Sequence, residues 1–133
     1  MIPRYSRAPM KEVWSSNTKF QIWLDIELYA CEAMEKLGTV PKGTSRKIRA
    51  KAKINEKRID KIESEVKHDV IAFLTSIAEY AGKPARFLHQ GLTSSDILDT
   101  AFNVQLMKSA KIINTELTNL IKSLKKISLK HKN

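Results

Sequence analysis

Three short clusters of polar residues stand out because their residue types can bind an anion or move a proton. The clearest runs from His89 to Asp96 and reads His-Gln-Gly-Leu-Thr-Ser-Ser-Asp. Thr93 and Asp96 have the spacing of a capping box, so we expect a helix to begin there. The first turn of a helix presents unpaired N–H groups and the positive end of its dipole, and the hydroxyls of Thr93, Ser94 and Ser95 add donors. The stretch therefore predicts a carboxylate or phosphate site, although an ordinary capped helix has the same pattern.

The other two clusters are Lys67-His68-Asp69 and Arg4-Tyr5. The first places a cation, an imidazole and a carboxylate at an expected helix start, where an aspartate favours the dipole. His68 can bind an anion, or act as an acid or base near neutral pH. The same three residues also suit a plain helix cap with solvated neighbours. Arg4-Tyr5 by itself predicts no function, because chain ends are commonly disordered.

Several classes of protein lack support in the sequence. There is no metal-ligand spacing, no glycine-rich phosphate loop and no Ser/His/Asp pattern, so we predict no metal and no cofactor. Cys31 is the only cysteine, and an intracellular, reducing compartment fits that best, so we expect a cytoplasmic protein. No apolar run approaches the roughly 18 residues that span a bilayer. Residues 1–7 carry no secretory signal, and we predict no membrane partner.

Helical periodicity and helix-ending residues predict an all-α protein. A first helix should begin near Ser15 or Ser16, both good N-caps, and end at Gly38. A short, very basic helix should run from Pro41 to about Ile54, and Asn55 should cap the next one. Apolar residues at helical spacing mark the expected buried faces: Phe20, Trp23, Ala30, Ala33, Met34 and Leu37, then Ile59 and Ile62, then Val70, Ile71, Leu74, Ile77, Ala78 and Ala81.

The last helix is predicted to be long and to need partners. Gly82 and Pro84 end the helix before it, and residues 82–93 form the one substantial loop. Its apolar residues step alternately by four and three, which is typical of a heptad seam: Leu106, Ala110, Ile113, Leu117, Leu120, Leu124 and Ile127. We therefore expect a small N-terminal helical domain at residues 1–105, followed at 106–133 by the first long helix of a central bundle. No Gly or Pro stops this helix before Asn133, so we also expect the sequence to be truncated.

The formal net charge of +10 is unevenly distributed. Residues 42–58 hold eight Lys or Arg against one acid, and residues 108–132 hold seven Lys against one acid. Such a balance attracts polyanions, so a basic helical nucleic-acid-binding module is one alternative. Solvated helix faces are the commoner explanation, and residues 42–58 contain no aromatic side chain to interleave with the cations. A second alternative, a helical interaction or scaffold protein, rests on the heptad seam alone and leaves the histidine clusters unexplained.

Taken together and in register, four stretches carry a resemblance that covers the whole sequence. They are Met-Ile-Pro-Arg-Tyr-Ser-Arg-Ala-Pro-Met at the start, Trp14-Ser15 leading to Lys19-Phe20 and Trp23-Leu24, Lys67-His68-Asp69-Val70-Ile71-Ala72-Phe73-Leu74, and residues 89–96. In this order and at these intervals they resemble the adenylosuccinate lyase family of the fumarase/aspartase superfamily. The resemblance extends over only the first part of a full family member.

The resemblance implies an enzyme that eliminates fumarate from adenylosuccinate to give AMP, and from succinylaminoimidazole carboxamide ribotide in purine biosynthesis. It also implies a homotetramer whose long helices form one bundle, with each active site at a meeting of three subunits. The matching positions would all contact or surround substrate: Arg4 and Tyr5 at the nucleotide, Lys67, His68 and Asp69 lining the pocket, Thr93 and Ser94 on the succinyl carboxylates, and His89 and Gln90 close by.

The sequence departs from the family pattern in its missing catalytic stretches. It contains neither a Gly-Arg-Ser-His-Gly-type stretch, which supplies the family's catalytic histidine, nor the later mobile loop with the serine thought to act as base. We therefore assign no principal acid or base, and treat His68 as at most an auxiliary catalytic or binding group. We expect this segment to be inactive by itself.

Overall fold

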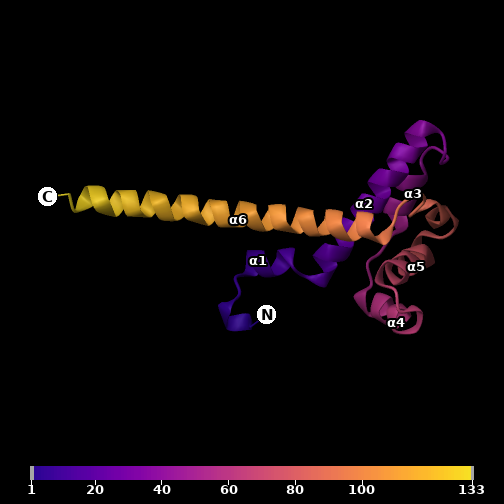
Figure 1. Ribbon diagram of the computed structural model, residues 1–133, viewed down its shortest axis with the longest axis horizontal. Helices are drawn as coiled ribbons and strands as arrows, with labels where there is room; N and C mark the ends of the chain where they lie inside the picture. The colour runs from indigo at the N-terminus through magenta and orange to yellow at the C-terminus, as the bar shows by residue number, and fades with distance from the viewer. Residues whose placement is uncertain (1, 133) are drawn as a thin grey trace.

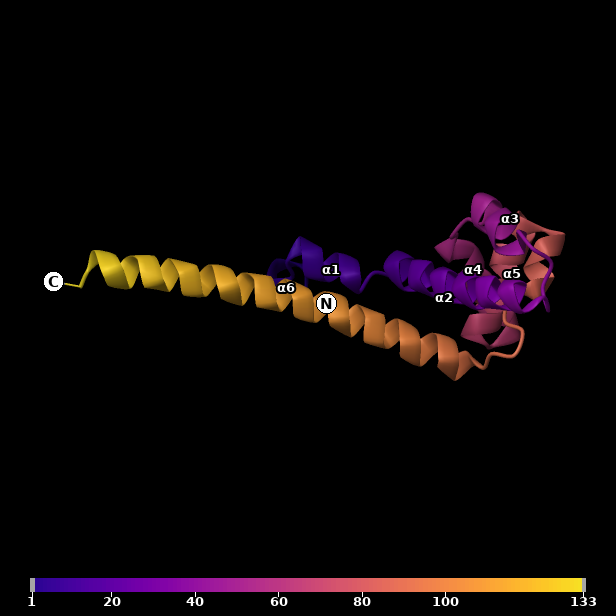
Figure 2. The same cartoon turned by 90° about the horizontal axis from the view of Figure 1, so that it is seen from above.

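The computed structural model describes residues 2–132, and the elements found there are helices joined by short turns (Figure 1). In chain order they are η1 (Pro3–Tyr5), α1 (Ala8–Val13), α2 (Ser16–Leu37), α3 (Thr44–Lys51), α4 (Glu56–Val66), α5 (Asp69–Ala81), η2 (Lys83–Phe87) and α6 (Ser94–Lys130). Helices α2 to α5 gather at one end of the molecule, and α6 extends far beyond them (Figures 1 and 2). The predicted all-α fold is confirmed.

Helix α2 forms the centre of the packed end. The Ser15 hydroxyl accepts the Thr18 N–H at 3.1 Å, and Gly38 ends the helix at φ 79°, so both predicted boundaries are confirmed. An aromatic trio lies in the core: Phe20 stacks on Phe73 at 5.7 Å between ring centroids, and Trp23 meets both rings edge-on.

The predicted buried face of α2 is partly wrong. Leu37 is 79% exposed and Ala33 is exposed as well. The buried stripe instead continues from Leu24 through Leu28 to Cys31. At 3.6 residues per turn, positions 33 and 37 fall on the opposite side of the helix from this stripe.

Helix α3 is shorter than the predicted 41–54. It begins only at Thr44, because Gly43 adopts the left-handed conformation with φ 81°, which interrupts a right-handed helix. The Glu35 carboxylate of α2 accepts the backbone N–H of Gly43 at 2.7 Å and that of Ser45 at 2.6 Å. These bonds from Ser45 and Gly43 lower the pKa of Glu35 and fasten the start of α3 to α2.

Helices α4 and α5 pack against each other, and the predicted cluster at residues 67–69 lies at the junction between them. The Asn55 side chain caps α4 by accepting the Arg58 N–H at 3.2 Å, as predicted. The Arg58 guanidinium in turn binds both carboxylate oxygens of Glu79 on α5. Ile59 and Ile62 are buried, as expected. The loop predicted at 82–93 contains the short helix η2.

Helix α6 crosses the expected domain boundary without a break. Its first half packs against α1 and α2 and buries Ile97, Ala101, Gln105 and Ser109. The Gln105 amide donates to the Val13 carbonyl at 2.8 Å, which ties α6 to the end of α1. The C-terminal part of α6 projects past every other element and ends at Lys130 (Figure 2). Asn133, the last residue of the expected second unit, lies outside the described residues.

Candidate functional site

The start of α5 is built around His68. Lys67 closes α4 in the left-handed conformation with φ 54°, which turns the chain sharply into the extended His68. The His68 Nδ1 accepts the Ile71 N–H at 3.3 Å, and the Asp69 carboxylate accepts the Val70 N–H at 2.7 Å. Because Nδ1 of His68 is an acceptor, the neutral ring carries its proton on Nε2.

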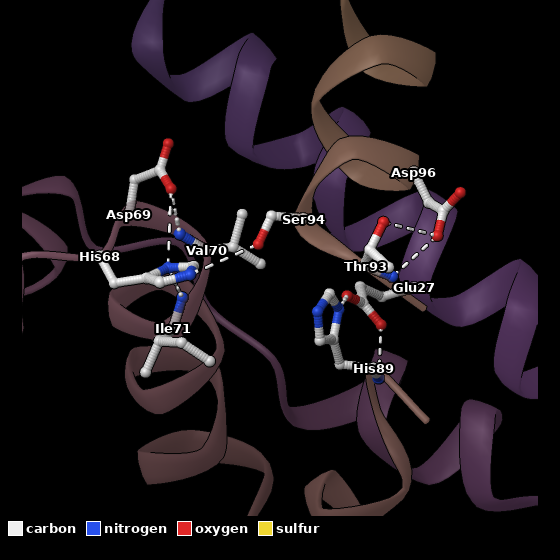
Figure 3. Close-up of polar contacts among 9 residues, drawn as sticks. All are labelled: Glu27, His68, Asp69, Val70, Ile71, His89, Thr93, Ser94 and Asp96. Carbon is white, nitrogen blue, oxygen red and sulfur yellow. Dashed lines mark hydrogen bonds and ion pairs between the residues drawn. The ribbon is translucent and has the colours of Figure 1, made fainter. Parts of the chain in front are cut away.

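The start of α6 lies directly beside the start of α5. His68 Nε2 is 3.5 Å from the Ser94 hydroxyl oxygen, although the two residues are 26 positions apart (Figure 3). Two helix N-termini therefore meet, and each contributes the positive end of a dipole and unpaired N–H groups. Among residues 2–132, no hydrogen bond from the N–H of Ser94 or Ser95 is found. The arrangement suits an anion held between the two helix starts.

The Thr93 hydroxyl is less available than the sequence suggested. Both its N–H and its hydroxyl donate to Asp96 Oδ2, at 2.7 and 3.1 Å (Figure 3). These two bonds lower the pKa of the Asp96 carboxyl, and the nearby His89 acts in the same direction. The predicted helix start at Thr93 is confirmed. A ligand carboxylate must displace Asp96 before it can bind the Thr93 hydroxyl, whereas the Ser94 hydroxyl already faces His68.

His89 is held by Glu27, a residue that the sequence analysis missed. Its backbone N–H donates to Glu27 Oε2 at 2.7 Å, and its ring Nδ1 is 2.6 Å from Glu27 Oε1. Glu27 is only 1% exposed and lies within the apolar stripe of α2. A signal was present: Phe20, Leu24 and Cys31 flank position 27 at steps of four, three and four, so a carboxylate there had to be buried.

The remaining predicted residues are spread over a wider area. The Gln90 amide donates to the Arg86 carbonyl at 3.2 Å and is exposed. Lys67 lines a shallow hollow with residues of α4. Arg4 lies over the ring of Tyr5, 4.9 Å from its centroid, and both are exposed.

Arg4 and Tyr5 are not brought to the helix starts within one chain. Tyr5 lines a hollow of about 530 Å³ beside the middle of α6, with Ile113 and Leu117 among its lining residues. At about 1.5 Å per residue, that part of α6 lies roughly 30 Å from Ser94. A single chain therefore brings His68 and Ser94 together at the two helix starts, with Asp69 beside His68 and with Thr93, Asp96 and His89 nearby (Figure 3), and leaves Arg4 and Tyr5 elsewhere.

Two further properties concern the described residues alone. In residues 2–132, no group of three His, Cys, Asp or Glu side chains is placed to hold a metal ion. None of the helices described there is both long and apolar enough to cross a membrane.

Comparison with known proteins gives the family. Residues 4–133 match the family model described as "Lyase". The chain belongs to the lyase family. This lyase-family chain is 45% identical over 132 residues to an adenylosuccinate lyase from Synechocystis, covering 99% of the chain and 31% of that protein. It is 45% identical over 113 residues to the adenylosuccinate lyase of Thermotoga maritima, covering 85% of the chain and 26% of that protein. It is 40% identical over 135 residues to that of Aquifex aeolicus, covering 99% and 31%.

A solved structure agrees with the fold of this lyase-family chain. The fumarate lyase from Mesorhizobium sp. BNC1 superposes with a TM-score of 0.83 at 22% identity, covering 96% of this chain and 32% of that one. At this identity the likeness concerns the fold. The chain thus spans about a third of the length of the relatives it matches. The resemblance seen in the sequence is confirmed, and the lyase interpretation is favoured over the nucleic-acid-binding and scaffold alternatives.

Proposed function

We propose that the complete protein is a carbon–nitrogen lyase that eliminates fumarate from adenylosuccinate to give AMP, and from succinylaminoimidazole carboxamide ribotide. The observation that carries the proposal is the meeting of the α5 and α6 starts, where His68 Nε2 lies 3.5 Å from the Ser94 hydroxyl. Support comes from relatives named adenylosuccinate lyase at 40% to 45% identity. The reaction belongs to purine biosynthesis, and we place it in the cytoplasm.

The helix starts suit the electronic demand of this elimination. Removing a proton beside a carboxylate builds extra negative charge on that carboxylate, and fixed donors aimed there lower the barrier. The Ser94 hydroxyl and the N–H groups of Ser94 and Ser95 are such donors. His68 and Asp69 would line the substrate pocket beside Ser94, Lys67 would border it from the end of α4, and Thr93 would join Ser94 on the succinyl group once Asp96 moves aside.

The nucleotide end of the substrate needs residues from other copies of the chain. Arg4 and Tyr5 would contact the nucleotide, yet within one chain they lie far from Ser94. We propose a homotetramer in which neighbouring subunits bring these residues, and the exposed apolar side of α6, together. His89 and Gln90 would border the pocket. No cofactor enters this proposal.

This chain by itself should catalyse no elimination, because none of its groups is assigned as principal acid or base. Losing one general acid or base typically forfeits about 10²–10⁴-fold in rate. An ultraviolet assay of adenylosuccinate with the purified chain tests this. Authentic turnover would show that the chain holds its own acid and base.

The binding role is tested in a full-length lyase that carries this segment. Ser94→Ala should lower kcat/KM roughly 10- to 100-fold, as expected for a hydrogen bond to a charged group worth about 1.5–3 kcal/mol. Ser123→Ala, at an exposed position of the same helix, is the matched control and should keep full activity. Equal activity in the two variants would contradict the proposal.

The role of His68 calls for a variant that keeps its helix cap. His68→Asn suits this, because asparagine is a good N-cap that accepts the same backbone N–H but has no ring to titrate. Activity in the full-length enzyme should fall while the melting temperature stays nearly unchanged. A variant that melts early but retains its rate would make His68 purely structural.

A further inference from the structure

Glu27 is a buried carboxylate whose two recorded bonds both go to one residue. Its side chain is fully buried in α2, its Oε2 accepts the His89 N–H at 2.7 Å, and its Oε1 meets His89 Nδ1 at 2.6 Å. Burying a charge is costly unless it is hydrogen-bonded. The pair also fixes the backbone of His89 at a positive φ of 60°, just before the chain enters α6.

The short Nδ1 contact decides where the imidazole carries its proton. An ionised carboxylate is an acceptor only, so His89 Nδ1 must be the donor. The other tautomer would place lone pairs of Nδ1 and Oε1 against each other at 2.6 Å. In the neutral ring, Nε2 is therefore left as an acceptor, on the side of the ring away from Glu27 (Figure 3).

The two histidines of the site thus present opposite hydrogen-bonding character. His68 uses Nδ1 to accept the Ile71 N–H, so its Nε2 bears a proton and donates towards Ser94. His89 uses Nδ1 to donate to Glu27, so its Nε2 accepts. The His89 side chain is 19% exposed, which leaves part of the ring open to a ligand.

We propose that Glu27 is a positioning residue that holds His89 in the Nδ1–H tautomer, so that His89 Nε2 accepts a hydrogen bond from an N–H or hydroxyl group of the bound ligand. The hydrogen bond between His89 Nε2 and a ligand rests on the proposed function. The tautomer itself does not depend on it. Glu27 touches no substrate in this scheme and acts only through His89.

Nitrogen-15 spectra of the imidazole rings in this chain test the proposal directly. Above the pH at which both rings have become neutral, His89 should show its proton on Nδ1 and His68 on Nε2. Glu27→Gln should move the His89 proton to Nε2. The single amide oxygen is needed by the His89 N–H, so the amide NH₂ faces Nδ1 and makes it an acceptor.

Glu32→Gln is the matched control on the same helix and should change neither ring, because Glu32 pairs with Arg49 and not with a histidine. The proposal is overturned by a wild-type His89 with its proton on Nε2, or by a Glu27→Gln chain that keeps the proton on Nδ1. Should Glu27→Gln fail to fold, the wild-type spectrum decides alone.

Kinetics of the full-length lyase separate this proposal from the proposed function. Glu27→Gln should raise KM more than it lowers kcat, because a ligand donor would face a ring N–H instead of a lone pair. A moved proton with an unchanged KM would refute the hydrogen bond between His89 Nε2 and the ligand, while the positioning role of Glu27 and the proposed reaction would stand. An unmoved proton would refute the positioning role, whatever the enzyme's activity.

Discussion

The two halves of α6 have similar apolar content and very different surroundings. Between Ser94 and Ser109, residues at every fourth position from Ile97 are buried against α1 and α2. Beyond residue 109, the leucines and isoleucines of the heptad seam from Ile113 to Ile127 are 49% to 58% exposed. The same helix is thus a core element at one end and largely exposed at the other, where Arg7 forms an ion pair with Glu116 and residues within 5–10 line a hollow beside Ile113 and Leu117.

This difference shows that an apolar repeat specifies a helix but not its partner. Most helical stability in proteins comes from packing an apolar face rather than from intrinsic propensity. The first half of α6 buries its apolar side within the chain, whereas the seam residues of the second half stay about half exposed. The proposed division into residues 1–105 and 106–133 stays a prediction; the last buried residue, Ser109, lies just past it.

The largest expected effect is on the free energy of unfolding, which should depend strongly on the first half of α6 and weakly on the second. Ile97→Ala should lower the free energy of unfolding by about 2–5 kcal/mol, because Ile97 is completely buried and its loss leaves a cavity. Leu120→Ala, at an exposed position, should change it by less than about 0.5 kcal/mol. Urea unfolding of the dilute, monomeric chain measures both values, and equal losses would show that the second half is packed within the monomer.

A smaller effect is expected from the polar contact within the first half. Gln105→Ala removes the buried bond to the Val13 carbonyl and should cost about 1–3 kcal/mol. Asn119→Ala, an exposed amide in the second half, serves as the control. If both variants unfold at the same urea concentration, the Gln105 bond does not hold α1 to α6.

The start of α6 makes a pH-dependent contribution to the stability of the fold. Thr93 lowers the pKa of Asp96 in the folded state below its ordinary value of 3.8, so Asp96 stabilises the fold above that pH. This contribution is lost as pH falls through the lowered folded pKa. Asp96→Asn should therefore be less stable than the wild type near neutral pH, and the difference should vanish in acid. Asp99→Asn is the control, and parallel acid curves for all three proteins would refute the role of Asp96.

Much of the fold could be predicted from the sequence because single residues determine several of the helix ends. Ser15, Gly38, Asn55 and Thr93 each fix a helix end through their own side chain or backbone freedom, and each was predicted in place. The start of α3 was misplaced because Glu35, a residue of the previous helix, caps it. Such long-range capping leaves no pattern within α3 itself.

The sequence named the residues of the candidate site but not how they lie relative to one another. The sequence marked His68 and Ser94 separately, and only folding shows that their helices begin side by side. Periodicity could have flagged Glu27 as a buried charge, yet its partner is 62 residues away. Conversely, the sequence could not show that the Thr93 hydroxyl binds Asp96, because the same spacing also allows a hydroxyl that faces solvent.

The last prediction concerns self-association of the chain, with little expected change in the stability of the monomer. The seam from Ile113 to Ile127 is an exposed apolar stripe, and such stripes tend to be covered by a partner. We expect the chain to self-associate through it, because in a purified sample the available partner is another copy. Leu120→Asp should shift sedimentation towards the monomer, since burying an unpaired carboxylate is costly, while urea unfolding of the monomer stays unchanged.

Thr118→Asp controls for the added charge, because Thr118 lies on the same exposed half of α6 but off the seam. It should leave self-association intact. A wild-type chain that stays monomeric at high concentration would contradict the prediction, and so would equal sedimentation of the two aspartate variants. The two halves of α6 would then differ only in how they pack within the chain. The apolar side of the second half would need a partner other than a second copy.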